Sequence, residues 1–549
     1  MGWLLGAAYF VFALATLSRQ YTFDAISYLW DVENSRLSFG GLAVTYNFFH
    51  SQHLLFSPIV YAFAGIFRLF GYGGQALLPA QILNLAEGAL TLSLVFMLMA
   101  RVTGDRGLSL LLAALLGCTY AFWSNTAMVS DHMASCLLSV LFLGQLTRRE
   151  GHPLQAPAAA GLGALNGLAF LMHQVNGLLG IVFIVSRLSG AGSMRQRARA
   201  IAIYTLSASV TAGIPYLAIG VLVLDNSTLH DFLFWSLYYA MPGVINVAGH
   251  YGTFSLHKML ETAAGFGAAV IGGFYWMNRV FETRFVQRQG IPALSAAAAL
   301  AFAAGVIGAF RRTRATRPAG GPPRRLMLIY GTHGAVYSLL LLWWWPSYYQ
   351  LWAVPMIGFV LLAAALLRRQ IGGALGERPD IARPLIVSVV LVFLANGIAV
   401  FIPSHDLSKN DYYVTSMAIG DRTAPGDLIV IPGDDEYETY LPYFAHRSIV
   451  SLHAGLIDRS NDLDSTVQDI TGKMEAVWDS GRAVWAVSEL LDTVRTYADV
   501  YELHGLTGES VASRFRRFAV DDTIDAQGLV LYRLRAAAPR SAMNTAGGE

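Results

Sequence analysis

Eleven apolar stretches constrain the fold of this chain more than any other feature of its sequence. A helix that crosses a bilayer needs roughly 20 apolar residues, with about 17–25 as the usual range. Only 13% of the residues are charged, against about 25% in soluble proteins. We therefore predict a mostly α-helical, polytopic membrane protein of about 11 transmembrane helices. The candidate spans cover about residues 2–17, 77–100, 107–128, 129–147, 156–173, 175–189, 200–224, 291–310, 326–345, 353–368 and 385–403.

The arginines predict the orientation of these spans, because cytoplasmic loops carry an excess of Lys and Arg. With the N-terminus inside, the arginine-rich segments fall on the cytoplasmic side at 101–106, 148–149, 187–199, 311–325 and 368–383. The large outer loops are then 18–76 and 225–290, and the C-terminal segment also lies outside. We expect an integral protein of the plasma (inner) membrane.

Two further apolar stretches, 53–71 and 257–277, do not fit this alternation as spans. Counting either one alone as a span would move the arginine-rich loops after it to the outside. We therefore predict that both are helices lying in the outer interface or packed shallowly on the bundle. This interpretation leaves Arg279, Arg284 and Arg288 outside.

The composition changes at about residue 404, where charged and turn residues become frequent. Short β-rich runs at 427–432, 447–452, 483–487 and 528–534 alternate with helical patterns at about 408–420, 463–480 and 489–500. Such alternation is typical of an α/β domain. We predict a transmembrane domain over 1–403, an extracytoplasmic α/β domain over 404–535 and a disordered tail over 536–549.

The stretch after the first span, YTFDAISYLWDVENSRL, carries the first candidate for catalysis. Asp24, Ser27, Tyr28 and Asp31 are three or four residues apart, so they share one face of a helix. A carboxylate on an interfacial helix is a candidate general base. The alternative is that Asp24 is an ordinary interfacial charge.

Histidines also gather in the predicted outer segments. His50 and His53 lie at i and i+3, and histidine pairs at such spacing bind Zn²⁺. No acidic residue stands at a fixed spacing to them, so we assign no metal ligands, although a divalent metal is allowed. His53 instead contacts substrate or caps the following helix. The aromatic and polar segment 225–257 is either a lid or an interfacial aromatic belt.

The order of a single span, the stretch around Asp24 and then HLLFSPIVYAFAGIFRLFG resembles the first outer loop of the GT-C superfamily of membrane glycosyltransferases. The pattern is most similar to the group of protein O-mannosyltransferases and lipid A aminoarabinose transferases, which are glycosyltransferase family 39-like. The resemblance covers the architecture of residues 1–403. It implies that juxtamembrane helices of this loop hold the catalytic acidic residue, and Asp24 matches that position.

Three other stretches fit the same resemblance. NTAMVSDH carries Asp131 where these enzymes commonly place a second acidic residue. GLAFLMHQVNG carries His173 where relatives have a Lys, Arg or His that faces the lipid phosphate. WWWPSYYQLWAVP carries Tyr348 and Tyr349, but it lacks the basic residue of related enzymes, which puts a direct phosphate contact at this turn in doubt.

The resemblance implies a hexosyl- or pentosyltransferase that uses a polyprenyl-phosphate-linked sugar. The acceptor would be a glycan, a lipid or a protein on the outer side. Asp24 would be the general base, because an acceptor hydroxyl must lose its proton. Substrate would be bound by Asp131, His173, Tyr348, Tyr349 and His53.

Two alternatives stand beside this prediction: a lipid-linked glycan transporter or flippase, and a glycan polymerase or ligase. Transporters usually show internal pseudo-symmetry and interrupted helices, and we see neither feature in the sequence. No nucleic-acid partner is expected, because no basic and aromatic stripe lies on a soluble module. The lipid bilayer is the expected environment.

Overall fold

The structure of the protein is a computed structural model that describes residues 1–38, 41–237, 255–272, 324–371, 375–433, 435–458, 462–494 and 506–535. Its contacts divide the chain into two compact units. The first unit contains Met1–Arg19 and Asp31–His405, and the second contains Gln20–Trp30 and Asp406–Glu549. The domain limits predicted from the sequence stay a prediction, and they did not anticipate residues 20–30 in the second unit.

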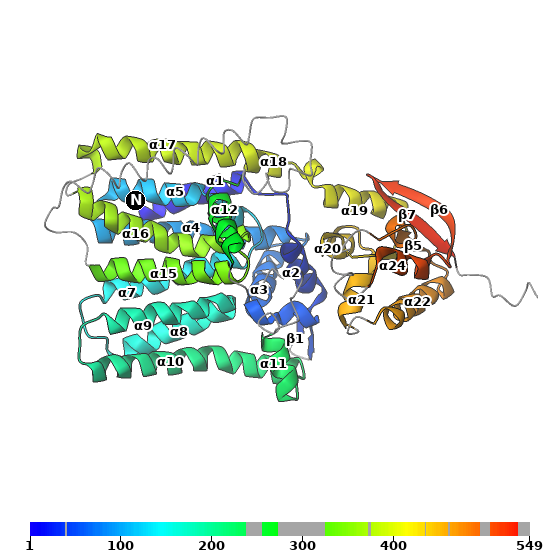
Figure 1. The fold of residues 1–549 in the computed structure, drawn as a ribbon, viewed down its shortest axis with the longest axis horizontal. Coiled ribbons are helices and arrows are strands. Elements are labelled where there is room, and N and C mark those ends of the chain that lie inside the picture. The colour runs from blue at the N-terminus through cyan, green and yellow to red at the C-terminus, as the bar shows by residue number, and fades with distance from the viewer. Residues whose placement is uncertain are drawn as a thin grey trace, which may run out of the picture. The chain divides into compact units, whose positions relative to one another are not determined.

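The first unit is a helical bundle in which α16 packs between α4 and α15, while α17 packs on α5 at the edge of the bundle (Figure 1). Helix α8 packs on α10, and α1 packs on α4. The α-helices that contribute to this unit are α1 (Gly2–Ala15), the end of α2 (Phe23–Asn34), α3 (Phe56–Leu69), α4 (Leu77–Thr103), α5 (Arg106–Cys118), α6 (Tyr120–Ala127), α7 (His132–Arg148), α8 (Ala156–Met172), α9 (Leu179–Leu188), α10 (Met194–Leu217), α11 (Leu229–Leu237), α12 (Leu256–Val270), α15 (Arg324–Trp343), α16 (Ala353–Ile371), α17 (Pro379–Asn396) and α18 (Ile402–Ser404).

Short helical turns extend several of these helices. Two are π-helical, η4 (Ala218–Val223) and η9 (Gly397–Phe401), and continue α10 and α17. The 3₁₀ turns are η3 (Gln174–Leu178), η7 (Tyr349–Trp352) and η8 (Leu375–Glu377). The first two of these precede α9 and α16, and they carry residues that matter for the site described below.

Within the described residues, four helical segments are long and apolar enough to cross a membrane, or five if the bent pair α5 and α6 forms one span. Five further apolar helices have 10–17 residues. The predicted total of about eleven spans is therefore not confirmed. The candidate span 291–310 lies outside the described residues.

The predicted span 107–128 consists of two helices, because α5 and α6 are bent by 65° at their junction; whether the pair crosses the membrane stays a prediction. Thr119 has an extended backbone there, with φ −64° and ψ 146°. Its hydroxyl donates to the Leu116 carbonyl over 2.7 Å, and the Asn396 amide donates to the Cys118 carbonyl over 2.7 Å. A break of this kind otherwise leaves backbone carbonyls without a hydrogen-bond donor. This break was not expected from the sequence.

The segment 18–76 was predicted to be the first outer loop, a name we keep for it, and it contains several short elements. Strand β1 (Arg36–Ser38) pairs antiparallel with β2 (Gly41–Ala43), and the 3₁₀ turns η1 (Tyr46–Phe49) and η2 (Ser51–His53) lead into α3. The predicted helix at 53–71 is confirmed as α3. The predicted helix at 257–277 corresponds to α12, and residues 273–277 lie outside the described part.

The second unit contains a five-stranded sheet of order β4-β3-β5-β7-β6. Strand β3 is parallel to β4 and β5, whereas β7 is antiparallel to β5 and β6. The strands are β3 (Leu428–Ile431), β4 (Ser448–Ser451), β5 (Val484–Val487), β6 (Ala519–Ala526) and β7 (Leu529–Arg535). The four predicted β-rich runs are confirmed as β3, β4, β5 and β7, and β6 was missed because its alternation carries acidic residues.

Helices cover both faces of this sheet. Leu428 and Val430 point into one core with α21, α22 and α24, and Ile429 and Ile431 point into the other with α19 and α20. This alternation follows from the two-residue period of a strand. The unit's helices are the start of α2, η10 (Leu407–Lys409), α19 (Asp411–Arg422), α20 (Asp435–Phe444), α21 (Leu452–Asp458), α22 (Leu463–Asp479), η11 (Ser488–Leu490) and α24 (Gly508–Phe515). The predicted helix over 489–500 is described only as far as Val494, where η11 is the sole helical turn.

Candidate functional site

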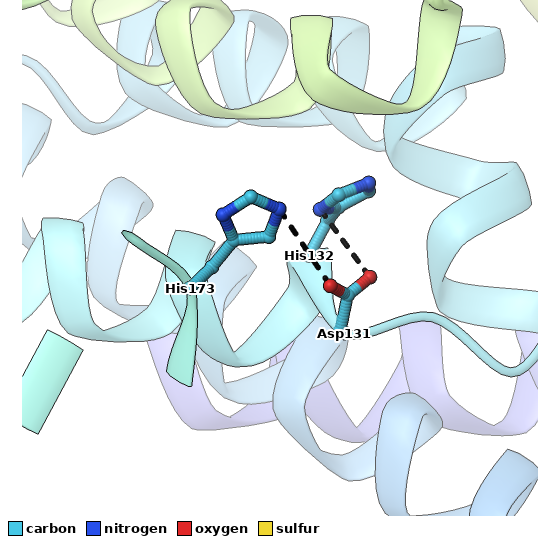
Figure 2. A group of neighbouring side chains, drawn as sticks. All are labelled: Asp131, His132 and His173. Carbon is cyan, nitrogen blue, oxygen red and sulfur yellow. Dashed lines mark ion pairs between the residues drawn. The ribbon is translucent and has the colours of Figure 1, made fainter. Parts of the chain in front are cut away.

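Asp131 is the centre of a buried polar cluster in the first unit. It lies in the turn between α6 and α7 and is only 5% exposed. Its carboxylate oxygens lie 3.4 Å from His132 Nδ1, 3.7 Å from His173 Nε2 and 4.0 Å from His53 Nε2. Figure 2 shows Asp131 with His132 and His173 on either side. We call Asp131 and these three histidines the Asp131 cluster.

Aromatic contacts extend the cluster in two directions. The His132 and His173 ring centroids are 5.1 Å apart, and His132 meets Tyr348 edge-on at 5.8 Å. On the other side, His50 stacks on His53 with centroids 4.3 Å apart and planes 9° apart. The cluster therefore joins the first outer loop, the start of α7, the end of α8 and the turn before α16.

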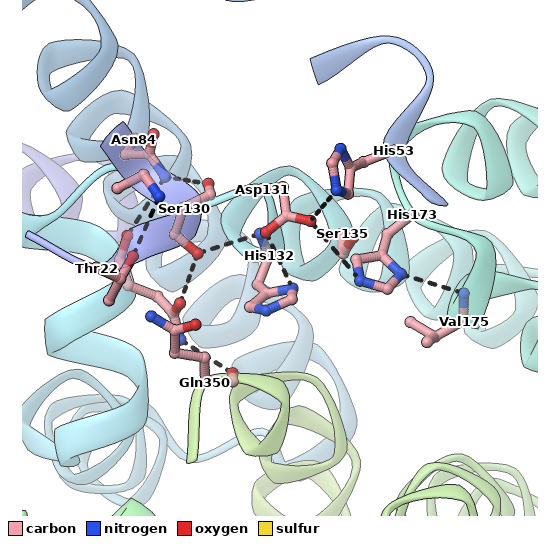
Figure 3. Close-up of polar contacts among 12 residues, drawn as sticks. Thr22, His53, Asn84, Ser130, Asp131, His132, Ser135, His173, Val175 and Gln350 are labelled. Atoms are coloured by element: carbon pink, nitrogen blue, oxygen red, sulfur yellow. Dashed lines mark hydrogen bonds and ion pairs between the residues drawn. The ribbon is translucent and has the colours of Figure 1, made fainter. Parts of the chain in front are cut away.

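The end of α8 sets the orientation of His173. Its Nδ1 accepts a hydrogen bond of 3.3 Å from the Val175 N–H at the start of η3. A neutral imidazole that accepts at one nitrogen carries its proton on the other. The His173 Nε2–H therefore faces the Asp131 carboxylate as a donor (Figure 3).

The first outer loop is tied to the same end of α8, which places His53. The Gln174 side chain donates to the Ser51 carbonyl over 3.0 Å, and the Leu55 N–H donates to the Leu171 carbonyl over 3.1 Å. These bonds bracket His53 on both sides in the sequence. His53 is 3% exposed as a result.

A network of amide and hydroxyl groups holds the Asp131 turn (Figure 3). The Asn84 amide donates to the Ser130 carbonyl over 2.5 Å, and the Ser130 hydroxyl donates to Asn125 Oδ1 over 2.6 Å. Asn125 in turn donates to the Gln350 carbonyl over 3.0 Å. Buried polar groups that satisfy one another in this way fix a unique arrangement. The turn is thus held between α4, α6 and the segment that contains Tyr348.

Burial controls the protonation of the cluster. It lowers the pKa of His173 to about 4, although Asp131 opposes the shift. It also lowers the pKa of His53 well below its usual value, and the neighbouring His50 adds to this effect. Burial raises the pKa of Asp131, while His173 lowers it. The imidazoles of His53 and His173 are therefore neutral at pH 7, so they offer hydrogen bonds rather than positive charge.

Asp131, His132 and His173 could together hold a metal ion, because one ligand atom from each lies within 4.8 Å of the others. His132 fits this role, since both of its ring nitrogens are buried without a hydrogen-bond partner in the described part of the chain. His173 does not fit as it stands. Its proton lies on Nε2, and a metal–Nε2 bond would require that proton to move to Nδ1, where the Val175 N–H now donates. Asp131 and His132 are therefore the two ready ligands.

The structure brings together four of the residues singled out in the sequence: His53, Asp131, His173 and Tyr348. The expected approach of His173 to the Tyr348 turn is confirmed, because both rings contact His132. Tyr349 points elsewhere, and its ring packs on Tyr120 with centroids 4.6 Å apart. The substrate roles assigned to these residues stay predictions.

From the sequence, His132 counted only as one of the histidines predicted outside and was assigned no role, although it follows Asp131 directly. The available signal was position: an Asp-His pair at the start of a helix places both side chains in the first turn. His50 and His53 had no acidic neighbour in the sequence, whereas the fold puts Asp131 beside His53 from 78 positions away.

Asp24 lies in the first turn of α2 and belongs to the second unit. Thr22 begins this helix, because its hydroxyl accepts the Ala25 N–H over 3.2 Å. Ile26 and Leu29 are buried on this helix, whereas Trp30 is 36% exposed. A carboxylate in a first helical turn is also stabilised by the helix dipole, so the general-base role of Asp24 stays a prediction.

The two other acidic residues of this stretch have structural partners in the first unit. Asp31 is 3% exposed and accepts a hydrogen bond of 2.5 Å from the Thr45 hydroxyl. Glu33 accepts from Arg68 over 2.9 Å and from the Ala76 N–H. These contacts fix the first outer loop to the bundle.

Comparisons with known proteins give a result at the level of structure. No protein-family model and no curated protein matches the sequence. ArnT from Cupriavidus metallidurans bound to undecaprenyl phosphate is similar, with a TM-score of 0.56, 14% identity and coverage of 97% of this chain and 98% of that one. The apo state of the same protein matches with a TM-score of 0.57 and 13% identity, and the match covers 97% of this chain and 97% of that one.

An oligosaccharyltransferase from Archaeoglobus fulgidus, in complex with Zn and sulfate, matches with a TM-score of 0.49 and 14% identity. That match covers 97% of this chain and 73% of the other. The two ArnT structures match nearly the whole chain, so the likeness includes the helical bundle and the C-terminal sheet. The chain therefore has the fold of ArnT.

Proposed function

We propose that the protein is an integral-membrane glycosyltransferase that moves a sugar from a polyprenyl-phosphate-linked donor to an acceptor hydroxyl on the outer side. The observation that carries this proposal is the Asp131 cluster, a buried carboxylate surrounded by three histidines in a bundle with the ArnT fold. ArnT was solved with undecaprenyl phosphate bound. A lipid phosphate of this kind is the product that the proposed reaction would leave.

In the reaction, the acceptor oxygen forms a bond to the anomeric carbon while the bond from that carbon to the phosphate oxygen breaks. The electron pair of the broken bond stays with the phosphate, which leaves as polyprenyl phosphate. The acceptor proton passes to a carboxylate, which we assign to Asp24. A base must come within about 2.6–3.2 Å of the hydroxyl to take this proton.

The Asp131 cluster suits the phosphate end of the donor. The His173 Nε2–H lies 3.7 Å from the carboxylate, which is too long for a direct hydrogen bond. A phosphate oxygen could accept from this N–H, and the Tyr348 hydroxyl is a second candidate donor on the far side of His132. Donors aimed at a leaving group stabilise its developing negative charge.

A divalent ion is allowed in this proposal but is not required by it. Asp131 and His132 would hold the ion, and the chemistry it supplies when bound is Lewis-acid stabilisation of a phosphate oxygen. Because His173 does not fit as a ligand, its proposed role is that of a hydrogen-bond donor. Metal analysis of the purified protein tests this: a bound ion lost in His132→Ala but retained in His173→Ala agrees with the assignment.

The central experiment separates the two carboxylates. Asp24→Asn should reduce turnover by about 10²–10⁴-fold if general-base catalysis is its main role, and it should leave undecaprenyl phosphate binding unchanged. His173→Ala should weaken that binding. Glu33→Gln is the matched control, since it lies in the same loop but is engaged with Arg68.

Turnover is measured with a panel of undecaprenyl-phosphate sugars, and binding with undecaprenyl phosphate alone. Full activity of Asp24→Asn together with an inactive Asp131→Asn would move the base to Asp131. If both variants stay active and wild-type protein does not bind undecaprenyl phosphate, the glycosyltransferase proposal fails.

A further inference from the structure

Three arginines lie close together where the end of α9 meets the starts of α10 and α15. Arg187 lies in the last turn of α9, Arg197 near the start of α10 and Arg325 at the start of α15. Positive charge in these segments is what predicted the cytoplasmic side from the sequence. Arg187 is only 3% exposed, however, and Arg197 and Arg325 are partly buried.

Carbonyls at the end of α9 account for part of this arrangement. Arg325 Nη2 donates to the Ser186 carbonyl over 2.6 Å, and Arg197 Nη1 donates to the Leu188 carbonyl over 2.8 Å. Arg187 Nη2 donates to the Ser186 hydroxyl over 2.8 Å. Cations near a helix C-terminus are favourable, so a purely structural role explains these three bonds.

Two observations exceed that structural role. The Nε–H groups of Arg187, Arg197 and Arg325 are all buried without a hydrogen-bond acceptor in the part of the chain that the structure describes. Glu150 is the one carboxylate paired with them there, at 3.9 Å from Arg325 Nη1. Three guanidinium groups therefore share one carboxylate. Buried cations and unsatisfied N–H groups are costly unless an anion compensates them.

We propose that Arg187, Arg197 and Arg325 form a binding site for one phosphate anion, carried by the headgroup of an anionic lipid in the leaflet on that side. Guanidinium groups recognise phosphate through paired N–H donors, and basic pockets between membrane helices bind anionic headgroups. Along its length, α9 exposes Ile181, Ile184 and Leu188. These side chains give the acyl chains an apolar surface beside the headgroup.

Gly190 supplies a test that leaves every charge in place. A Cβ at this position would lie under 3 Å from the Nη2 and Cζ atoms of Arg325. Gly190 has no positive φ, so alanine fits its backbone and the flexible guanidinium must move instead. Gly190→Ala should therefore displace Arg325 from the site without removing a cation.

The experiment measures the thermal stability of the full-length protein in detergent as phosphatidylglycerol is added, with zwitterionic phosphatidylcholine, whose net charge is zero, as the comparison. Phosphatidylglycerol should stabilise the wild type. Arg187→Gln should raise the half-saturating lipid concentration about 10-fold or more, because hydrogen bonds to a charged group are lost. Gly190→Ala should weaken the response in the same direction. Arg101→Gln, which removes an exposed arginine at the end of α4, should respond like the wild type.

Parallel titrations with inorganic phosphate and glycerol 1-phosphate distinguish the source of the anion. A response to phosphatidylglycerol alone supports a lipid site, and a response to all three supports a phosphate site that does not depend on acyl chains. No response of the wild type to any of them overturns the proposal. An equal loss of the lipid response in Arg101→Gln and Arg187→Gln, with no loss in Gly190→Ala, also overturns the proposal. Net charge alone would then explain lipid binding. If Arg187→Gln does not fold, Gly190→Ala carries the test.

Discussion

The Asp31 carboxyl gives the sharpest prediction for stability. Burial raises its pKa from 3.8 to about 6, and the hydrogen bond from Thr45 only partly opposes the shift. The unfolded chain therefore releases this proton at lower pH than the folded protein does. The stability associated with the protonated carboxyl is fully present below about pH 4 and is lost as the pH rises through about 6. Each unit of pKa shift corresponds to about 1.4 kcal/mol, so the loss is roughly 3 kcal/mol by pH 8.

Asp31→Asn removes this ionisation and keeps an oxygen that can accept the Thr45 hydroxyl. The variant should be more stable than the wild type by roughly 3 kcal/mol at pH 8 and about equally stable near pH 4. This difference corresponds to roughly 3–6 °C in the unfolding temperature of a protein of this size.

The assay is thermal unfolding in detergent at a series of pH values, followed by tryptophan fluorescence. The difference between variant and wild type isolates Asp31 from the other titrating groups. Thr45→Val serves as the companion variant, because loss of the hydroxyl should raise the Asp31 pKa further and extend the loss of stability to higher pH. If the wild type and Asp31→Asn keep a constant difference between pH 4.5 and 8, the buried, partly protonated carboxyl does not exist.

Two further variants test how the units are held together internally. The Asn396 side chain forms hydrogen bonds with the Cys118 and Val270 carbonyls and the Gly272 N–H. Asn396→Leu should therefore destabilise the first unit by about 1–3 kcal/mol for each buried group that loses its hydrogen-bond partner. Unfolding in detergent measures this loss, and unchanged stability would contradict the prediction. Arg447→Met should destabilise the second unit by about 3 kcal/mol, because the buried guanidinium bonds carbonyls at the end of α19, including those of Gly420 and Thr423. Limited proteolysis of the full chain should then cut the C-terminal sheet faster, and an equal cutting rate would refute the role.

The sequence predicted the parts of this fold that depend on local composition. Long apolar runs give helices such as α4 and α15, and β-rich runs of five to seven residues give β3, β4, β5 and β7. Strand β6 was not predicted, because its sequence AVDDTIDA has acidic residues at exposed positions. The break at Thr119 was not predicted for a different reason, because hydrophobicity does not indicate where a helix bends. The residue that donates a hydrogen bond to the Cys118 carbonyl at the break is Asn396, which lies 278 positions away in the sequence.

The candidate site shows the same limit. Asp131, His173 and Tyr348 could be selected one at a time, because each stands at the end of an apolar helix. Their shared contact, His132, could only be seen once the helices had packed. Protonation is likewise a property of the packed state, since the low pKa of His173 follows from burial and has no signal in the residues beside it.

The bend between α5 and α6 has a consequence for how this chain can vary between species. Every residue of α6, from Tyr120 to Ala127, is buried, whereas α5 still exposes Leu110 on one side. Substitutions in α5 should therefore be tolerated with the helical period, and substitutions in α6 should be selected against at all eight positions. A segment that reads as one uniform apolar run would thus contain two different rates of evolution, with the change falling at Thr119.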